Sequence, residues 1–174
     1  MGLFIGLKRV AYGAPLTAKP TKDTFDNLIK TGFTEIKNVH QGTWGYSQDD
    51  PSVTEYINEL TGQPYHRDAE DSGRKTINFT IGAYELADKA ALQGGTVTNG
   101  VWEAPTTPTL INKAIIAETK TGGIVIFPNA GIVAKTDTQD KNLGLGLSAV
   151  AMESEVGEVK IAEEYWIDPS AAGE

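Results

Sequence analysis

Residues 76–81 read Thr-Ile-Asn-Phe-Thr-Ile, and this alternation sets the fold class. Ile77, Phe79 and Ile81 fall on one face of an extended chain, because successive side chains of a strand point to opposite faces. The stretch therefore predicts a strand with one buried face. Similar patterns predict further strands at 7–12, 33–39, 110–119, 124–127 and 132–135.

Turn residues divide some of these strands from one another. Thr121-Gly122-Gly123 predicts a hairpin between 110–119 and 124–127. Pro128-Asn129-Ala130-Gly131 is expected to end the second of these strands before another begins at 132. Taken together, the patterns predict a mainly β protein.

Residues 143–152 predict one more strand, with glycines on one face. Apolar residues occupy its odd-numbered positions from Leu143 onward, whereas Gly144 and Gly146 leave the start of the other face nearly bare. Glycine inside a strand usually marks a bulge, a bend or the close approach of another backbone. We expect Gly144 and Gly146 to permit close contact with another strand or another subunit. The stretch lacks the Gly-Lys-Ser/Thr ending of a phosphate loop, so no nucleotide site is expected.

Only one helix is predicted, over residues 83–93. The segment contains good helix formers, has Glu85 four residues before Lys89, and stops at Gly94-Gly95. No linker divides the chain. The predicted architecture is a single domain over 1–174, a β-sandwich or barrel with one flanking α-helix.

Composition excludes several classes of protein. The chain has 174 residues, of which 40% are hydrophobic, so a globular core is expected. The longest purely apolar run is 124–127, far below the roughly 20 residues of a membrane-spanning helix. Lys8 and Arg9 follow the apolar N-terminal stretch, so no secretory signal is expected. The absence of cysteine excludes disulfides, thiol nucleophiles and zinc-thiolate sites.

Charge is concentrated in two segments of a chain with a net charge of −8. Residues 47–71 and 153–174 each hold seven acids and one base, whereas the rest of the chain is mildly basic. Acidic surface repels phosphate, so tight wrapping of nucleic acid is disfavoured. The simplest interpretation is a solvated loop and an acidic C-terminal arm at 153–174. Tyr165-Trp166-Ile167 is predicted to cap the core or an interface, with the core favoured.

The segment 41–73 fits the predicted core poorly. Pro51 and Pro64 limit where a central strand could lie, and residues 53–60 and 63–67 predict an extended hairpin that turns near Gly62. A polar insertion of this length costs ordering entropy for little burial, so it is either mobile or ordered by a partner. Aromatic side chains favour a partner surface. The predicted contacts are Val53, Tyr56, Leu60 and Tyr65, with Trp44 and Tyr46 at the base of the hairpin and Gly144 and Gly146 on the glycine-rich strand.

No catalytic signature emerges. His40 and His66 lie in unrelated contexts, and neither belongs to a metal-binding His pattern. Asp68-Ala69-Glu70-Asp71 lacks the spacing of a calcium loop. A pair of carboxylates for glycoside cleavage stays open, but nothing in the sequence selects one. The chain is not expected to be an enzyme or to hold a cofactor or metal.

Several phrases of the sequence are distinctive. They are Gly42-Thr43-Trp44-Gly45-Tyr46-Ser47-Gln48-Asp49-Asp50-Pro51-Ser52-Val53-Thr54-Glu55-Tyr56, then Asn58-Glu59-Leu60-Thr61-Gly62, residues 75–82 running into the helix, 124–134, and 137–141 before the glycine-rich strand. With these phrases the chain resembles the major tail tube proteins of long-tailed, siphovirus-type bacteriophages, in a version carried by phages of gut bacteria. The resemblance covers roughly residues 4–167.

The resemblance implies a structural virion protein. Such proteins form a β-sandwich with a flanking helix and assemble into hexameric rings, whose inner strands join into one β-barrel around a channel. Stacked rings, bridged by loops and terminal arms, make the tail tube that conducts DNA into the host cell. The implied partners are further copies of the chain, the tape measure and tail terminator proteins, and double-stranded DNA in transient, non-specific passage through an acidic lumen. The implied location is the virion tail, and the host bacterial cytoplasm during assembly.

Two alternatives stay open. A secreted carbohydrate-binding β-sandwich could use Trp44, Tyr46, Trp102 and Trp166 as platforms for sugar rings, but it would need an export route. The tube protein of a contractile tail or secretion machine shares the ring architecture and differs in its sheath or effector partners.

Overall fold

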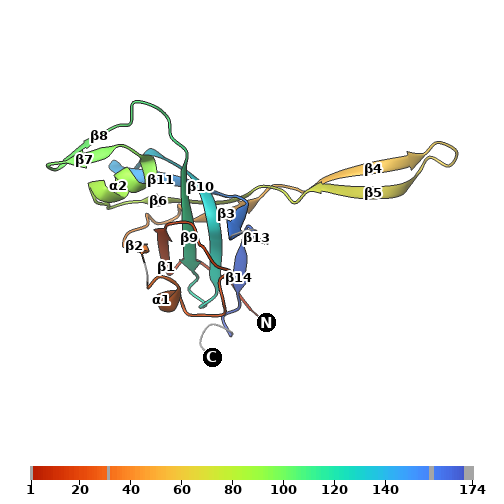
Figure 1. Ribbon diagram of the computed structural model, residues 1–174, viewed down its shortest axis with the longest axis horizontal. Coiled ribbons are helices and arrows are strands. Elements are labelled where there is room, and N and C mark those ends of the chain that lie inside the picture. The colour runs from red at the N-terminus through yellow and green to blue at the C-terminus, as the bar shows by residue number, and fades with distance from the viewer. Residues whose placement is uncertain (1, 31, 157–158, 171–174) are drawn as a thin grey trace.

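A large antiparallel sheet organises the molecule (Figure 1). The computed structural model describes residues 2–30, 32–156 and 159–170. The strands of the main sheet are β1 (Arg9–Gly13), β2 (Thr34–Ile36), β3 (Gly45–Gln48), β6 (Lys75–Ile81), β9 (Ile111–Glu118), β10 (Ile124–Gln139), β11 (Asn142–Ala151) and β14 (Tyr165–Ile167). Their order is β2-β1-β9-β10-β11-β6-β3, and β14 pairs with β10 beside this path. The mainly β class is therefore confirmed.

The remaining elements lie outside this sheet. They are the strand pairs β4 (Ser52–Asn58) with β5 (Gln63–Asp71), β7 (Thr96–Thr98) with β8 (Val101–Glu103) and β12 (Ser154–Val156) with β13 (Val159–Ile161), and the helices α1 (Phe25–Leu28) and α2 (Leu86–Gln93).

The expectation of one helix is wrong, because the described residues form two. α1 is a single turn whose first amides are capped by Thr24, which accepts a hydrogen bond from the Asn27 amide. Phe25 anchors this turn in the core. α2 begins three residues later than predicted, where the Asp88 carboxylate accepts the Glu85 amide at 3.4 Å, and it ends at Gln93 as the glycines indicate.

The expected break at residues 128–131 is also wrong. β10 runs without interruption from Ile124 to Gln139, with an irregularity in its pairing to β9 between Phe127 and Ala130. A bulge leaves its extra residues unpaired, so Pro128 costs no ladder hydrogen bond there. The neighbour of β10 changes at this point, because β14 pairs with its first residues and β11 with Ala130 onward. β10 thus connects two halves of the sheet.

Two apolar clusters lie on opposite faces of β1, β9 and β10. Neighbouring residues of β9 show the division, since Ile115 belongs to the larger cluster and Ile116 to the smaller one. The larger cluster extends under β6 and β11 and includes Leu92 of α2. The smaller cluster includes Phe25 of α1 and Ile167 of β14. Strands buried on both faces read as continuous apolar runs, which explains the composition of 124–127.

Arg9 links β1 to α1 and β2. Its Nη2 lies 2.7 Å from Asp26 Oδ1, and its Nε lies 3.1 Å from Glu35 Oε1. The guanidinium also stacks over Phe25, 4.4 Å from the ring centroid. The hydrogen bonds from Arg9 hold the pKa of Glu35 below its ordinary value.

We expect Glu35→Gln to destabilise the protein by about 1 kcal/mol at neutral pH. A carboxylate with a lowered folded-state pKa stabilises the fold above its unfolded pKa and loses that contribution as the pH falls. The deficit should therefore shrink as the pH drops below 4.5, the ordinary pKa of Glu35. Urea unfolding of the wild type and of Glu35→Gln, from neutral pH to below pH 4.5, measures this difference in stability. Glu55→Gln, which removes an exposed ion pair, is the control with little expected effect. An equal loss of stability at every pH would contradict a stabilising role for the ionised Glu35 carboxylate.

Candidate assembly surfaces

β4 and β5 form a ribbon that projects from the body, and we call β4, β5 and the turn between them the arm (Figure 1). Within the arm Tyr56 lies opposite His66, and the register shifts near each end of the ribbon. Neither strand pairs with the main sheet, and every residue of β5 is exposed. A two-stranded ribbon in water is marginally stable alone. In the free chain, the arm therefore depends on its own cross-strand contacts.

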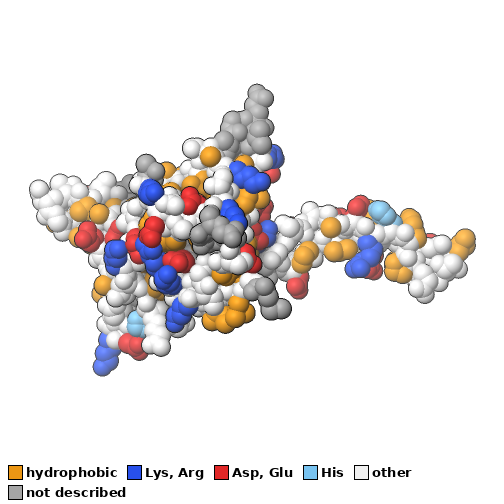
Figure 2. All heavy atoms as spheres, turned by 90° about the horizontal axis from the view of Figure 1, so that it is seen from below, with side chains coloured by type: hydrophobic (Ala, Val, Ile, Leu, Met, Phe, Trp, Pro, Cys, Tyr) orange, Lys and Arg blue, Asp and Glu red, His pale blue; other side chains and the backbone are white. Residues whose placement is uncertain are grey.

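The arm carries apolar side chains with no cover in the free chain (Figure 2). Leu60 is 94% exposed and Tyr65 69% exposed. The other large exposed apolar residues of the arm are Val53, Tyr56 and Ile57. Contiguous exposed apolar surface is a common feature of interaction sites, so the arm is a candidate for one. Ile57 was missing from the predicted contacts, although it shares the face of Val53 by strand alternation.

The two faces of the arm differ in chemistry. On one face the rings of Tyr56 and His66 lie 5.6 Å apart and those of Tyr56 and Tyr65 lie 6.5 Å apart. On the other, Arg67 Nε lies 2.8 Å from Glu55 Oε1. Cross-strand aromatic and ionic pairs are the units that stabilise such a ribbon.

Backbone contacts fix where the arm leaves the body. The Asp49 amide donates to the Arg74 carbonyl at 2.8 Å, and the Gly73 amide donates to Asp71 Oδ1 at 3.0 Å. Gly73 has a φ of +82°, and a Cβ there would collide with the carbonyl oxygen of Asp49. The direction of the arm is thus set by β3 and β6, which flank its base.

Trp44 and Tyr46 pack inside their own chain. The Trp44 ring lies 6.0 Å from Phe79, and the Tyr46 ring makes a T-shaped contact with Trp166 at 5.4 Å. Tyr46 donates its hydroxyl hydrogen bond to Glu164 at 2.7 Å, and burial together with this carboxylate raises the pKa of Tyr46. Both residues are half-buried and brace the body next to the arm.

Part of the predicted acidic C-terminal arm belongs to the main sheet. β14 pairs with β10, and its apolar residue Ile167 is buried in the smaller cluster. Lys75 Nζ lies 3.3 Å from Glu163 and 3.8 Å from Glu164, so one positive charge is shared between two of the acids. Residues 171–174 lie outside the described residues.

The outer face of β10, β11, β6 and β3 carries small and polar side chains together with Val133, which is 64% exposed. Cross-strand neighbours run from Lys135 through Gly146 to Thr80, and from Val133 through Ser148 to Asn78. A hollow of about 380 Å³ lies over these residues. Within it Asp137 accepts hydrogen bonds from Gln139 and Thr80, which lower its pKa.

The predicted contact residues Gly144 and Gly146 lie on this face. Gly144 is buried against its own chain, since a Cβ there would sit 2.7 Å from Thr80 Cγ2 and 3.0 Å from the Ile81 oxygen. Gly146 is half-buried and lines the hollow. The close approach at Gly144 is between strands of one chain.

The strands β10, β11, β6 and β3 form one half of the main sheet. Both edges of this half lack a strand partner in the described part of the chain. β3 pairs with β6 and ends the order of the sheet. On β10 the pairing with β9 stops at Ile132, so residues 133–139 pair with β11 alone. Unpaired edges are templates for pairing with another chain.

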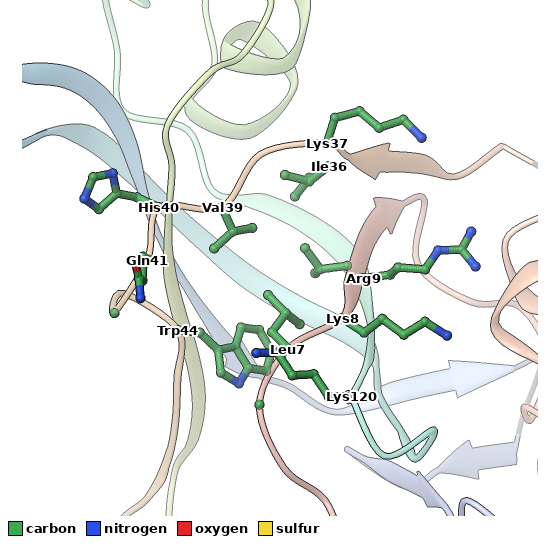
Figure 3. A pocket seen from close by; sticks show the side chains of 13 residues that line it. Leu7, Lys8, Arg9, Ile36, Lys37, Val39, His40, Gln41, Trp44 and Lys120 are labelled. Carbon is green, nitrogen blue, oxygen red and sulfur yellow. The ribbon is translucent and has the colours of Figure 1, made fainter.

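A cavity of about 330 Å³ lies between the N-terminal strand and the segment that leads from β2 to β3 (Figure 3). Its apolar lining includes Leu7, Val39 and Trp44, and its charged lining is entirely basic. Lys8 and Lys37 are paired with Glu118 and Glu35, at 3.0 and 3.2 Å. Within the described residues, no carboxylate lies within 4.0 Å of Lys120, whose side chain lies next to Leu7 and Trp44.

The two histidines each face a carboxylate. His40 Nε2 lies 3.2 Å from Asp140 Oδ2, and His66 Nε2 lies 3.7 Å from Asp68 Oδ2. No group of three or more His, Cys, Asp and Glu side chains that could hold a metal ion occurs in residues 2–30, 32–156 and 159–170. Over the same ranges no helix has the length and apolar character needed to cross a membrane.

Trp44 and Trp102 are half-buried and give the sugar-platform alternative no support. Besides Trp44 and Trp166, Trp102 also packs within the chain, where it donates to the Gly94 carbonyl at 3.0 Å and lies 4.4 Å from Lys89 Nζ. Trp166 is 46% exposed and makes T-shaped contacts with Phe4 and Tyr46.

The chain matches no protein-family model, and no curated protein matches it significantly.

Proposed function

We propose that this protein is the tube-forming subunit of a siphovirus-type phage tail, a structural protein whose copies close into rings. The resemblance to that family implies six subunits in each ring. The observation that carries the proposal is the pair of open edges on β3 and on residues 133–139 of β10. Closure through neighbouring copies would satisfy the backbone groups at both edges.

The strand directions support such a closure. In the order β10-β11-β6-β3, each strand is antiparallel to its neighbour. An even number of alternating strands places the open edge of β3 antiparallel to the β10 edge of the next copy. Every subunit can then repeat the same contact around a cyclic axis, which is how closed rings form.

The arm and the charge balance support stacking and DNA passage. The arm extends beyond the body with its apolar residues uncovered, as expected of an element that reaches a neighbouring copy. A net charge of −8 disfavours adhesion of a DNA duplex, so the duplex would slide through the lumen. Tape measure and tail terminator proteins are the further proposed partners, in the virion tail and in the host cytoplasm during assembly.

Cysteine cross-linking tests the edge contact directly, because the chain has no cysteine of its own. We expect the double variant Ser47→Cys with Lys135→Cys, two positions on the same face of the sheet, to give a ladder of oligomers that ends at the closed ring when it is treated with a bifunctional maleimide. Each single variant is the matched control and should give no ladder. Assembled protein whose double variant stays monomeric on a denaturing gel would contradict the edge pairing.

A further inference from the structure

We propose that the basic cavity receives the turn of a neighbouring copy's arm, with Leu60 over its apolar lining and Glu59 facing Lys120. The inference rests on the proposed function, and it identifies the surface on which the arm docks. The occupant is a second copy of this chain.

The cavity suits a small apolar group beside a carboxylate. Leu7, Val39 and Trp44 provide the apolar lining, and their side chains converge in Figure 3. Lys120 lies at the same place with no carboxylate within 4.0 Å among the described residues. Lys8 and Lys37 are already paired with Glu118 and Glu35, so Lys120 is the lysine of the lining whose charge is available to an incoming carboxylate. The cavity volume, about 330 Å³, lies at the low end of the range for ligand sites.

The turn of the arm is built to present such a group. Asn58 organises it: its Oδ1 accepts the Leu60 amide at 2.9 Å, and its carbonyl accepts the Gly62 amide at 2.7 Å. These hydrogen bonds hold Leu60 outward, where its side chain is 94% exposed. Glu59 precedes it and is exposed as well. A pre-ordered turn loses little conformational entropy on docking.

Charge and geometry select the occupant. Residues 52–71 of the arm hold five acids and one base, which complements a cavity whose charged lining is basic. The seven residues of β4 carry the turn roughly 23 Å from the base of the arm. The arm points away from the body that holds the cavity, so it cannot fold back into the cavity of its own chain (Figure 1). A nucleic acid is the poorer candidate, because its phosphates would gain nothing from the apolar lining.

Charge reversal with compensation tests the contact. We expect Lys120→Glu and Glu59→Lys, each alone, to raise the protein concentration needed for tube formation by about tenfold or more. The double variant restores the opposite charges and should return this concentration to within about threefold of wild type. Tube formation is measured by light scattering and negative-stain electron microscopy. Lys19→Glu and Asp50→Lys are matched controls, because Lys19 does not line the cavity and Asp50 lies outside the turn.

The outcomes separate this contact from the proposed function. Tubes from wild type, impaired single variants and a rescued double variant support the docking. Single variants that assemble normally, or a double variant that is not rescued, overturn the docking and leave the tube function standing. A wild-type protein that never forms rings or tubes overturns both. If Lys120→Glu assembles normally but loses retention on a short DNA duplex, the cavity is a phosphate site and the docking is overturned.

Discussion

Replacing Tyr56 and Tyr65 by alanine is expected to leave a folded chain that no longer builds tubes. Both rings lie on one face of the arm and are 43% and 69% exposed, so the body loses no core contact. At an interface, buried tyrosines commonly contribute about 2 kcal/mol each. Losing both at every subunit contact would weaken association by roughly a thousandfold.

Electron microscopy of the double variant at concentrations where wild type forms tubes measures this loss, and circular dichroism checks the fold. The matched control is Glu55→Ala with Arg67→Ala, which removes the ion pair on the other face of the arm at no net change of charge. Tubes of normal length from the tyrosine variant would count against the arm as an assembly contact.

The second large effect is expected at Gly144, where valine should destabilise the fold by about 3 kcal/mol. A Cβ at this position meets two backbone oxygens, those of Ile81 and Asp137, at 3.0 and 3.1 Å. Backbone in the middle of a sheet cannot move aside as a flexible side chain can, so β6 and β10 would have to separate from β11. Chemical unfolding of the purified variant measures the loss.

Gly45→Val provides the control for Gly144→Val. Gly45 also lies in a strand of the same sheet, but no atom lies within 4 Å of a Cβ built there. Valine at Gly45 should therefore change the free energy of unfolding little. Equal stability of the two variants would show that the close approach at Gly144 is not a constraint on the fold.

Much of the sheet was predictable because its strands carry a local signal. Ile77, Phe79 and Ile81 alternate with polar residues, and all three are buried in the larger cluster. The break expected at Pro128 failed for a nonlocal reason, since a bulge absorbs the proline and β10 continues beside a new neighbour. α1 was missed because a four-residue helix has no periodicity, and its local signals are Thr24 at the N-cap and Asp26 in the first turn.

The candidate surfaces also divide into features with a local sequence signal and features that depend on residues far apart in the chain. The exposed residues of the arm follow from aromatic and apolar positions within one polar segment of the sequence. The burial of Trp44 and Tyr46 depends on Phe79 and Trp166, which lie far along the chain. The basic cavity joins residues near positions 8, 40 and 120, so no local pattern could indicate it.

Negative-stain electron microscopy of the purified wild-type protein over a concentration series tests the central claim most directly. The account predicts closed rings, and hollow filaments at higher concentration, with a central channel wide enough for a DNA duplex. A protein that stays monomeric at every concentration would contradict it.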